Sequence, residues 1–193
     1  MENDPIKLFD SWFKEAKKIP AHESDAVVLA TSSANNQPSA RVVLIRVYDE
    51  RGFCFFTNLT SHKAHDLKDN PKAALCFYWD ALDRQVRIEG TVEAVTEKEA
   101  DDYFAARHRG SQIGAWASKQ SSVMEDELDL ANRIKQVTEQ FGGSGPIPRP
   151  PFWSGYRLIP HNIEFWEMRQ YRLHKRSLFT KQENKWNKEI LYP

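Results

Sequence analysis

Two arginines and a histidine alternate near the end of the chain, at Arg172, His174 and Arg176. Successive side chains of a β-strand point to opposite faces, so a strand over this stretch places all three on one face. Such a face suits an anion, because the planar fork of an arginine pairs bidentately with phosphate. Taken alone, the spacing favours a solvated edge strand whose charges block aggregation. The rest of the chain decides between the two interpretations.

A second candidate for anion binding is the segment Phe56–His65. We expect a strand, a polar turn and then a helix capped by Thr60 or Ser61, with Lys63 in its first turn. Free backbone N–H groups and the helix dipole favour phosphate at such a place. The segment has no glycine-rich loop, so it is not a P-loop.

A third candidate combines Tyr103 and Arg107, which are neighbours on one face of an expected helix, with Ser111 further along. These three side chains can hold a phosphate, and a surface pair is an equally good interpretation. Gln85, in an expected strand, offers an amide to the edge of a heterocycle. An exposed strand residue explains Gln85 equally well.

Arg41 and Arg46 belong to an apolar stretch, Ser39–Val47, which we expect to form one strand. Their opposite parity makes them face opposite ways on an ideal strand. One arginine can then serve a site inside a barrel and the other a neighbouring surface. The alternative is that both cap the ends of the strand.

Composition and charge exclude several classes of protein. The 193 residues include 27 basic and 27 acidic ones, so no global charge favours nucleic acid or an anionic membrane. No apolar run is long enough to span a membrane and no signal-peptide pattern opens the chain, so we expect a cytoplasmic protein. Cys54 and Cys76 lie in apolar stretches and are expected to be buried free thiols, although a disulfide stays open. No Cys/His spacing predicts a metal site.

The elements that must position these residues are mainly strands. Short turns join most of them, which favours antiparallel pairing and a small closed barrel with helices outside. We expect one domain, 1–193, with an N-terminal helix in 1–20 and C-terminal strands in 156–193 that complete the site. Further boundaries come from local signals: capping boxes at Thr96–Glu99 and Ser122–Glu125, and two strands at Tyr156–Ile159 and Asn162–Glu167.

Several of these stretches together resemble the pyridoxamine 5′-phosphate oxidase family, over nearly the whole chain. Each is weakly specific alone, and they occur in the family's order. The resembling segments are Arg41–Arg46, Phe56–Asn58, Ser61–Lys63, Arg84–Val86, Tyr103–Arg107, Ser111–Ala115, Ser118–Ser122, Ile163–Trp166 and Arg172–Arg176.

The resemblance implies an FMN-binding split β-barrel, mainly β with peripheral helices, and a homodimer with FMN at the interface. Arg172 and His174 would be the catalytic pair. The cofactor-binding residues it implies are Arg41, Val42, Val43, Leu44, Arg46, Phe56, Thr57, His62, Lys63, Gln85, Gln120, Ser121, Trp166 and Arg176. The substrate-binding residues it implies are Arg46, Tyr103, Arg107, Ser111, Arg172 and His174.

The implied reaction is oxidation of pyridoxamine or pyridoxine 5′-phosphate to pyridoxal 5′-phosphate. Dioxygen is the acceptor and yields hydrogen peroxide, and the amine substrate also releases ammonia. The alternatives are a flavin- or vitamin B6-binding protein with little oxidase activity, and an FMN reductase of the same fold. The complete substrate set favours the oxidase over a carrier.

Four residues depart from the family's pattern. Arg46 stands where lysine is usual, His62 where arginine is usual, Phe56 where tyrosine is frequent, and Lys175 where aspartate is usual. His62 is expected to make phosphate binding weaker and sensitive to pH. The chain starts close to its first expected helix, so we also expect it to lack the family's longer N-terminal segment.

Overall fold

The computed structural model of the protein describes residues 4–20, 23–183 and 185–193. Within these residues nine strands form one sheet in which every pair is antiparallel. The strands are β1 (Ala26–Ser32), β2 (Pro38–Leu44), β3 (Val47–Asp49), β4 (Gly52–Asn58), β5 (Lys72–Trp79), β6 (Arg84–Ala94), β7 (Trp153–Glu167), β8 (Lys175–Gln182) and β9 (Lys185–Leu191).

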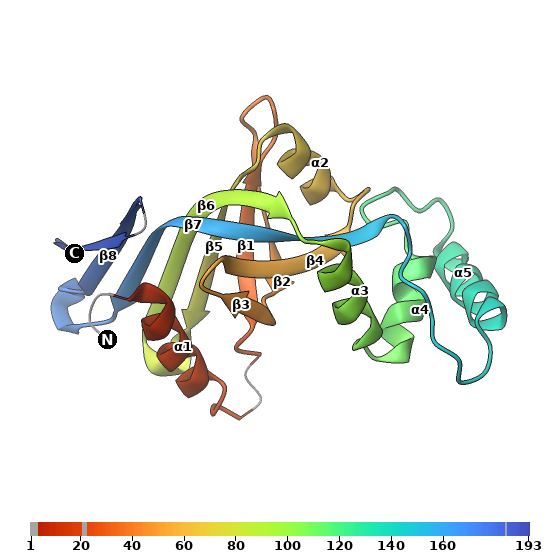
Figure 1. The fold of residues 1–193 in the computed structure, drawn as a ribbon, viewed down its shortest axis with the longest axis horizontal. Coiled ribbons are helices and arrows are strands. Elements are labelled where there is room, and N and C mark those ends of the chain that lie inside the picture. Colours follow the sequence, from red (N-terminus) through yellow and green to blue (C-terminus); the bar gives the residue numbers. More distant parts are fainter. Residues whose placement is uncertain (1–3, 21–22, 184) are drawn as a thin grey trace.

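The hydrogen-bonded path through the described strands runs β2-β1-β5-β6-β7-β4-β3, and β8 and β9 extend it from β7. The path does not return to its start, so the barrel is split and the closed barrel expected from the short turns is wrong. The mainly β class with peripheral helices is confirmed (Figure 1).

Five α-helices of the described chain lie outside the sheet: α1 (Pro5–Ala16), α2 (His62–Asp69), α3 (Glu97–Ala105), α4 (Arg109–Ala117) and α5 (Glu127–Gln140). Local capping sets two of their starts as predicted. The Asp4 side chain accepts from the backbone N–H groups of Ile6 and Lys7, and Thr96 and Glu99 form a reciprocal capping box. The second expected box is wrong, because α5 begins after Asp126, whose side chain caps it.

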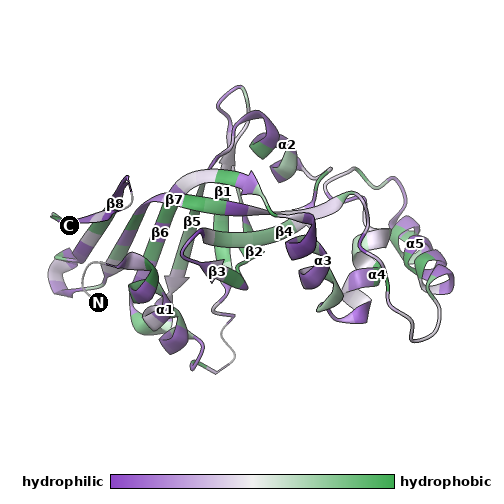
Figure 2. Cartoon of the chain, viewed as in Figure 1, coloured by the Kyte–Doolittle hydropathy of each residue, from purple (hydrophilic) through white to green (hydrophobic). Residues whose placement is uncertain are grey.

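The core lies between α1 and the inner face of the sheet. Phe9 and Phe13 of α1 are buried and contact Phe77 and Trp79 of β5. Hydrophobic colouring is concentrated on the central strands, whereas α3 is largely hydrophilic (Figure 2). Burial of large aromatic side chains therefore holds α1 on the sheet. Helices α3 and α4 lie at the other end of the sheet (Figure 1).

Strand β7 is a single 15-residue strand where two strands were predicted. Pro160, which lies between the two predicted strands, is paired opposite Gly90 where the register with β6 shifts after Glu89. Such an irregularity accommodates a residue that cannot donate to the ladder. Whether the strand continues through Pro160 is decided by its pairing with β6, which the local sequence does not reveal.

Two strand predictions that bear on the site are wrong. Strand β2 ends at Leu44, so Arg46 lies between β2 and β3. Arg41 and Arg46 therefore do not share a strand, and the prediction that they face opposite sides of one strand does not apply. Arg172 lies in a short 3₁₀ turn, η2 (Gln170–Arg172), with left-handed backbone at Tyr171 (φ 57°) and at Arg172 itself (φ 62°). Because β8 starts only at Lys175, neither Arg172 nor His174 shares a strand face with Arg176.

Candidate functional site

A cavity of about 800 Å³ opens between the ends of β2 and β4 and the helices α2, α3 and α4. It collects most of the predicted site residues from the first two thirds of the chain: Arg41, Val42, Val43, Leu44, Phe56, Thr57, His62, Lys63, Tyr103, Arg107, Ser111, Gln120 and Ser121. Further lining residues were not predicted as site residues: Ser39, Asn58, Gly114, Ala115, Ser118 and Trp153.

One part of the cavity is cationic because Lys63 and Arg41 line it together. The Lys63 side chain is only 8% exposed and its Nζ donates to Thr57 Oγ1 at 3.2 Å. Burial, and then the charge of Arg41, lower the pKa of Lys63 below its ordinary value. Arg41 donates to Thr31 Oγ1 at 2.6 Å and lies 3.7 Å from the buried carboxylate of Asp66. An anion beside Lys63 would relieve the unfavourable burial of its charge.

The start of α2 adds to this cationic part. Ser61 occupies the N-cap position, but its side chain makes no capping hydrogen bond. His62 follows as the first helical residue, and its Nδ1 lies 3.7 Å from Asp66. The helix dipole and the amide groups of the first turn favour a negative group here.

Arg107 defines a second cationic place in the same cavity. Its Nη1 is buried and has no hydrogen-bond partner in the described structure, and burial lowers its pKa. The guanidinium lies 4.9 Å from the ring centroid of Trp153, which fixes its position. A buried donor without a partner is costly, so an anionic ligand at this point fits the chemistry of the side chain.

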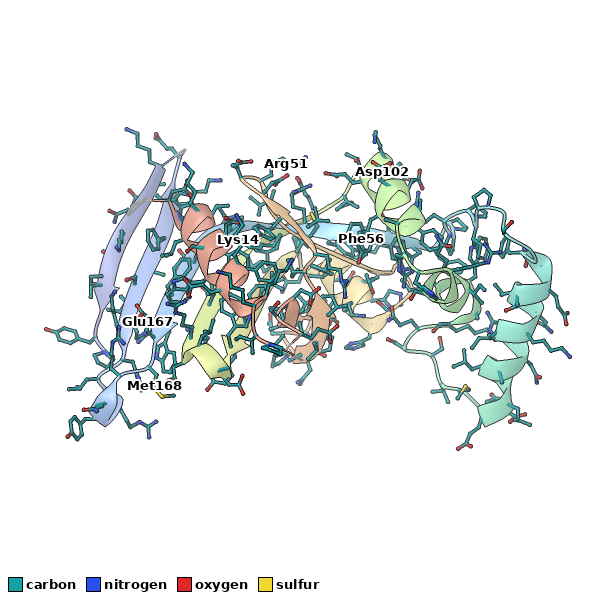
Figure 3. All side chains as sticks on the ribbon, turned by 90° about the horizontal axis from the view of Figure 1, so that it is seen from below. Lys14, Arg51, Phe56, Asp102, Glu167 and Met168 are labelled. Atoms are coloured by element: carbon teal, nitrogen blue, oxygen red, sulfur yellow. The ribbon has the colours of Figure 1, made fainter. Side chains whose placement is uncertain are left out.

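Three parallel rings stand beside Arg107. Tyr103 stacks on Phe56 with 3.9 Å between centroids and 8° between planes, and Phe56 stacks on Trp153 at 5.6 Å. The stack joins α3 to β4 and β7, so it determines where Tyr103 stands. Phe56 and Asp102 of α3 are labelled in the same half of the molecule in Figure 3.

The loop after α4 is tied to the end of β4. Gln120 Oε1 accepts from Thr57 Oγ1 at 3.1 Å and from the backbone N–H of Asn58 at 3.2 Å. Ser121 has left-handed backbone with φ 71°. These contacts bring both predicted loop residues to the cationic part that contains Lys63.

A second group of predicted residues lies at the opposite end of the chain's long axis, where β8 and the C-terminus stand (Figures 1 and 3). Trp166 of β7 pairs with Gln85 on one side and with Arg176 on the other. The His174 ring lies 4.5 Å from that of Trp166. Arg176 Nε donates to Glu164 at 2.7 Å, and Arg172 is exposed. Within one chain this group does not line the cavity.

Arg46 is also outside the cavity. Its Nε lies 3.0 Å from the carboxylate of Asp25, and its side chain is half exposed. Arg46 comes two residues after Leu44, which lines the cavity and ends β2, but its guanidinium is paired with Asp25.

Other groups show no competing chemistry in the described residues. No cluster of three or more His, Cys, Asp or Glu is arranged to hold a metal ion, and none of the helices there is long and apolar enough to cross a membrane. Cys54 and Cys76 are free, Cys54 buried and Cys76 half-buried. Burial raises the pKa of the Cys54 thiol to about 11, so it is not a ready nucleophile.

The fold and cavity define a split-barrel protein with a cationic, aromatic ligand cavity. A crystal structure of PhzG from Burkholderia lata 383 in complex with tetrahydrophenazine-1-carboxylic acid has the same fold, with a TM-score of 0.92 and 31% identity over 99% of this chain and 93% of that one.

The family described as pyridoxamine 5′-phosphate oxidase matches residues 13–141, and its C-terminal dimerisation region matches 153–193. The chain therefore belongs to the pyridoxamine 5′-phosphate oxidase family, and the second match implies a homodimer. A pyridoxine/pyridoxamine 5′-phosphate oxidase from Burkholderia cenocepacia is 53% identical over 92% of this chain and 82% of its own. The one from Rubrobacter xylanophilus is 48% identical over 98% and 87%.

Proposed function

We propose that the protein is an FMN-dependent oxidase that converts pyridoxamine and pyridoxine 5′-phosphate to pyridoxal 5′-phosphate. The observation that carries this proposal is the pair of cationic places in one cavity, Lys63 with Arg41 and Arg107 with its unpartnered Nη1. A phosphorylated cofactor uses one of these cationic places and a phosphorylated substrate uses the other. Relatives named as oxidases of these substrates at 48–53% identity support the same function.

The cofactor phosphate binds Arg41 and Lys63, with Thr57 and the amides at the start of α2 as further donors. These residues fit FMN because Lys63 is a buried cation whose pKa is already lowered by burial and by Arg41. The chemistry that FMN supplies when bound is acceptance of a hydride from the substrate's 4′ carbon and delivery of the electrons to dioxygen, which becomes hydrogen peroxide.

The substrate phosphate binds Arg107, Tyr103 and Ser111. Arg107 Nη1 then gains the acceptor that it lacks among the described residues. The cavity brings these three residues and the cofactor set to one space, so the substrate's ring lies between the two phosphates. The protein's contribution is to hold the 4′ carbon near the flavin and to exclude water.

The second protomer completes the site with Gln85, Trp166, Arg172, His174 and Arg176. Within one chain these residues do not line the cavity, and the homodimer implied by the C-terminal region supplies a second copy of them. Arg172 and His174 hold the substrate ring and handle the proton of its hydroxyl or amine.

Anaerobic mixing of the FMN-loaded protein with each phosphorylated substrate tests the proposal. Bleaching of the flavin, followed by pyridoxal 5′-phosphate and peroxide after air is admitted, is the expected result. Ammonia accompanies the product only from the amine. Firm FMN binding without bleaching by either substrate would replace the oxidase with a carrier or a reductase of the same fold.

A further inference from the structure

Gly114 occupies an unusual position in the middle of α4. Together with Ser111, Ala115 and Ser118 it forms the side of the helix that lines the cavity. A Cβ built on Gly114 meets no heavy atom of the described residues within 4 Å apart from the backbone of its own helix, and Gly114 is not in the left-handed region. The chain itself therefore leaves room for a side chain at this position.

Other glycines of the sheet have a reason within the fold. A Cβ on Gly52 would lie 2.1 Å from the carbonyl oxygen of Leu158, and one on Gly90 would lie 2.0 Å from that of Ile159. Gly114 has neither a clash nor a strained conformation to explain it. A glycine inside a helix is less favourable than alanine, so its presence opposes the stability of α4.

The contents of the cavity supply the missing reason. Ser111 is one turn before Gly114 on the same side of the helix. Arg107 precedes Ser111 by four residues and also lines the cavity. Ser118 is one turn later and its carbonyl accepts from Asn58 Nδ2 at 3.5 Å, next to the Lys63 part. The helical rise puts Gly114 about 4.5 Å along the axis from Ser111. Gly114 thus lies between the two cationic places.

We propose that Gly114 is a specificity-determining residue whose missing side chain makes room for the ring of the phosphorylated substrate. The inference rests on the proposed function and adds to it the wall against which the substrate ring lies. Any side chain at position 114 narrows the space between the two phosphate-binding places without touching either. A phosphate alone does not occupy that space.

The test compares Gly114→Ala and Gly114→Leu with Gly110→Ala and Gly110→Leu. Gly110 is an exposed glycine of the same helix outside the cavity, and its Cβ would make only an ordinary contact with the His108 ring at 3.4 Å. The readouts are the thermal midpoint, FMN affinity from flavin fluorescence, pyridoxal 5′-phosphate affinity from absorbance, and competition by inorganic phosphate.

We expect Gly114→Leu to keep or raise the thermal midpoint, because leucine favours a helix more than glycine does. Its affinity for pyridoxal 5′-phosphate should fall about 10- to 100-fold, the range typical of overfilling a fitted pocket. Gly114→Ala should give a smaller loss. Affinities for FMN and inorganic phosphate should stay within about twofold, since neither needs the space next to position 114.

Unchanged affinity for pyridoxal 5′-phosphate in Gly114→Leu overturns the inference and leaves the proposed function standing. Parallel losses of thermal midpoint, FMN and phosphate binding also overturn it, because they show a structural role. An equal loss of pyridoxal 5′-phosphate affinity in Gly110→Leu contradicts it too, because that side chain lies outside the cavity. A wild-type protein that neither binds nor oxidises the phosphorylated substrates overturns the proposed function, and the inference with it.

Discussion

Lys63 is a buried cation beside another cation, and this controls what the cavity accepts. If the proposed function holds, replacing it with alanine removes a charge-assisted hydrogen bond to the FMN phosphate, worth about 1.5–3 kcal/mol or roughly a 10- to 150-fold loss of FMN affinity. Titration of the apoprotein with FMN measures the loss. Lys68→Ala is the matched control, because Lys68 is exposed near the other end of α2. Equal affinities of the two variants would show that Lys63 does not hold the phosphate.

The same lysine predicts a pH dependence. Burial and Arg41 lower the pKa of Lys63 below its ordinary 10.5, so it loses its proton at a lower pH than an exposed lysine. A bound phosphate favours the charged form and raises that pKa. FMN affinity should therefore fall as pH rises through the pKa of Lys63 in the free protein. In Lys63→Arg this fall should vanish, because a guanidinium stays charged, and an identical fall in that variant would assign the titration to another group.

In the proposed function, Arg172 and His174 are the residues that act on the substrate during the chemical step. Each alanine variant should bind FMN with little change in affinity. The rate at which substrate reduces the bound flavin should fall at least about 100-fold, within the range for a proton-transferring or orienting side chain. Anaerobic single-turnover bleaching measures the rate directly. Leu173→Ala is the control from the same exposed stretch. Bleaching at the wild-type rate in both variants would remove them from the reaction.

At the scale of elements, the position of α3 depends on Arg157. This fully buried arginine of β7 donates to Glu99 of α3 at 2.6 Å and to Asp49 of β3 at 2.9 Å. Glu99 is also the third residue of α3 and the partner of Thr96 in the capping box, one turn before Tyr103. Arg157 therefore links the sheet to the helix that carries Tyr103.

Arg157→Met should destabilise the fold by about 2 kcal/mol, less than the roughly 3–5 kcal/mol of a fully buried pair, because both carboxylates are partly exposed. Urea denaturation gives the value. Arg51 touches the same two carboxylates but is exposed, so Arg51→Met should shift the midpoint only slightly. Comparable shifts in the two variants would mean that burial of Arg157 adds nothing.

The elements also show what local sequence can and cannot predict. The starts of α1 and α3 were predicted because each cap depends on residues within four positions, such as Asp4 and Thr96. The continuity of β7 through Pro160 depends on its partner strand β6, which is distant in sequence. The turn at Arg172 depends on left-handed backbone that no residue type there announces.

At the scale of the molecule, the site predictions separate into two groups. Residues 41–121 of the predicted set meet in the cavity, apart from Arg46 and Gln85. Residues 166–176 lie at the far end of the sheet, together with Gln85 (Figure 1). Motifs indicate which side chains suit a ligand but not which protomer supplies them. The resemblance implied a homodimer with the cofactor at its interface, but the sequence alone did not show which predicted residues lie apart within one chain.

The two halves predict complementation between inactive variants. In the proposed twofold dimer, each site would take Lys63 from one protomer and Arg176 from the other. Lys63→Ala and Arg176→Ala homodimers should each bind FMN poorly. After unfolding and refolding as an equal mixture, about half of the dimers are mixed and each has one intact site, so about a quarter of wild-type sites should return. Mixing Lys63→Ala with Arg41→Ala should restore none, because both changes fall in the same half. Recovery in neither mixture would place the whole site within one chain, and recovery in both would mean that Lys63 and Arg41 come from different protomers.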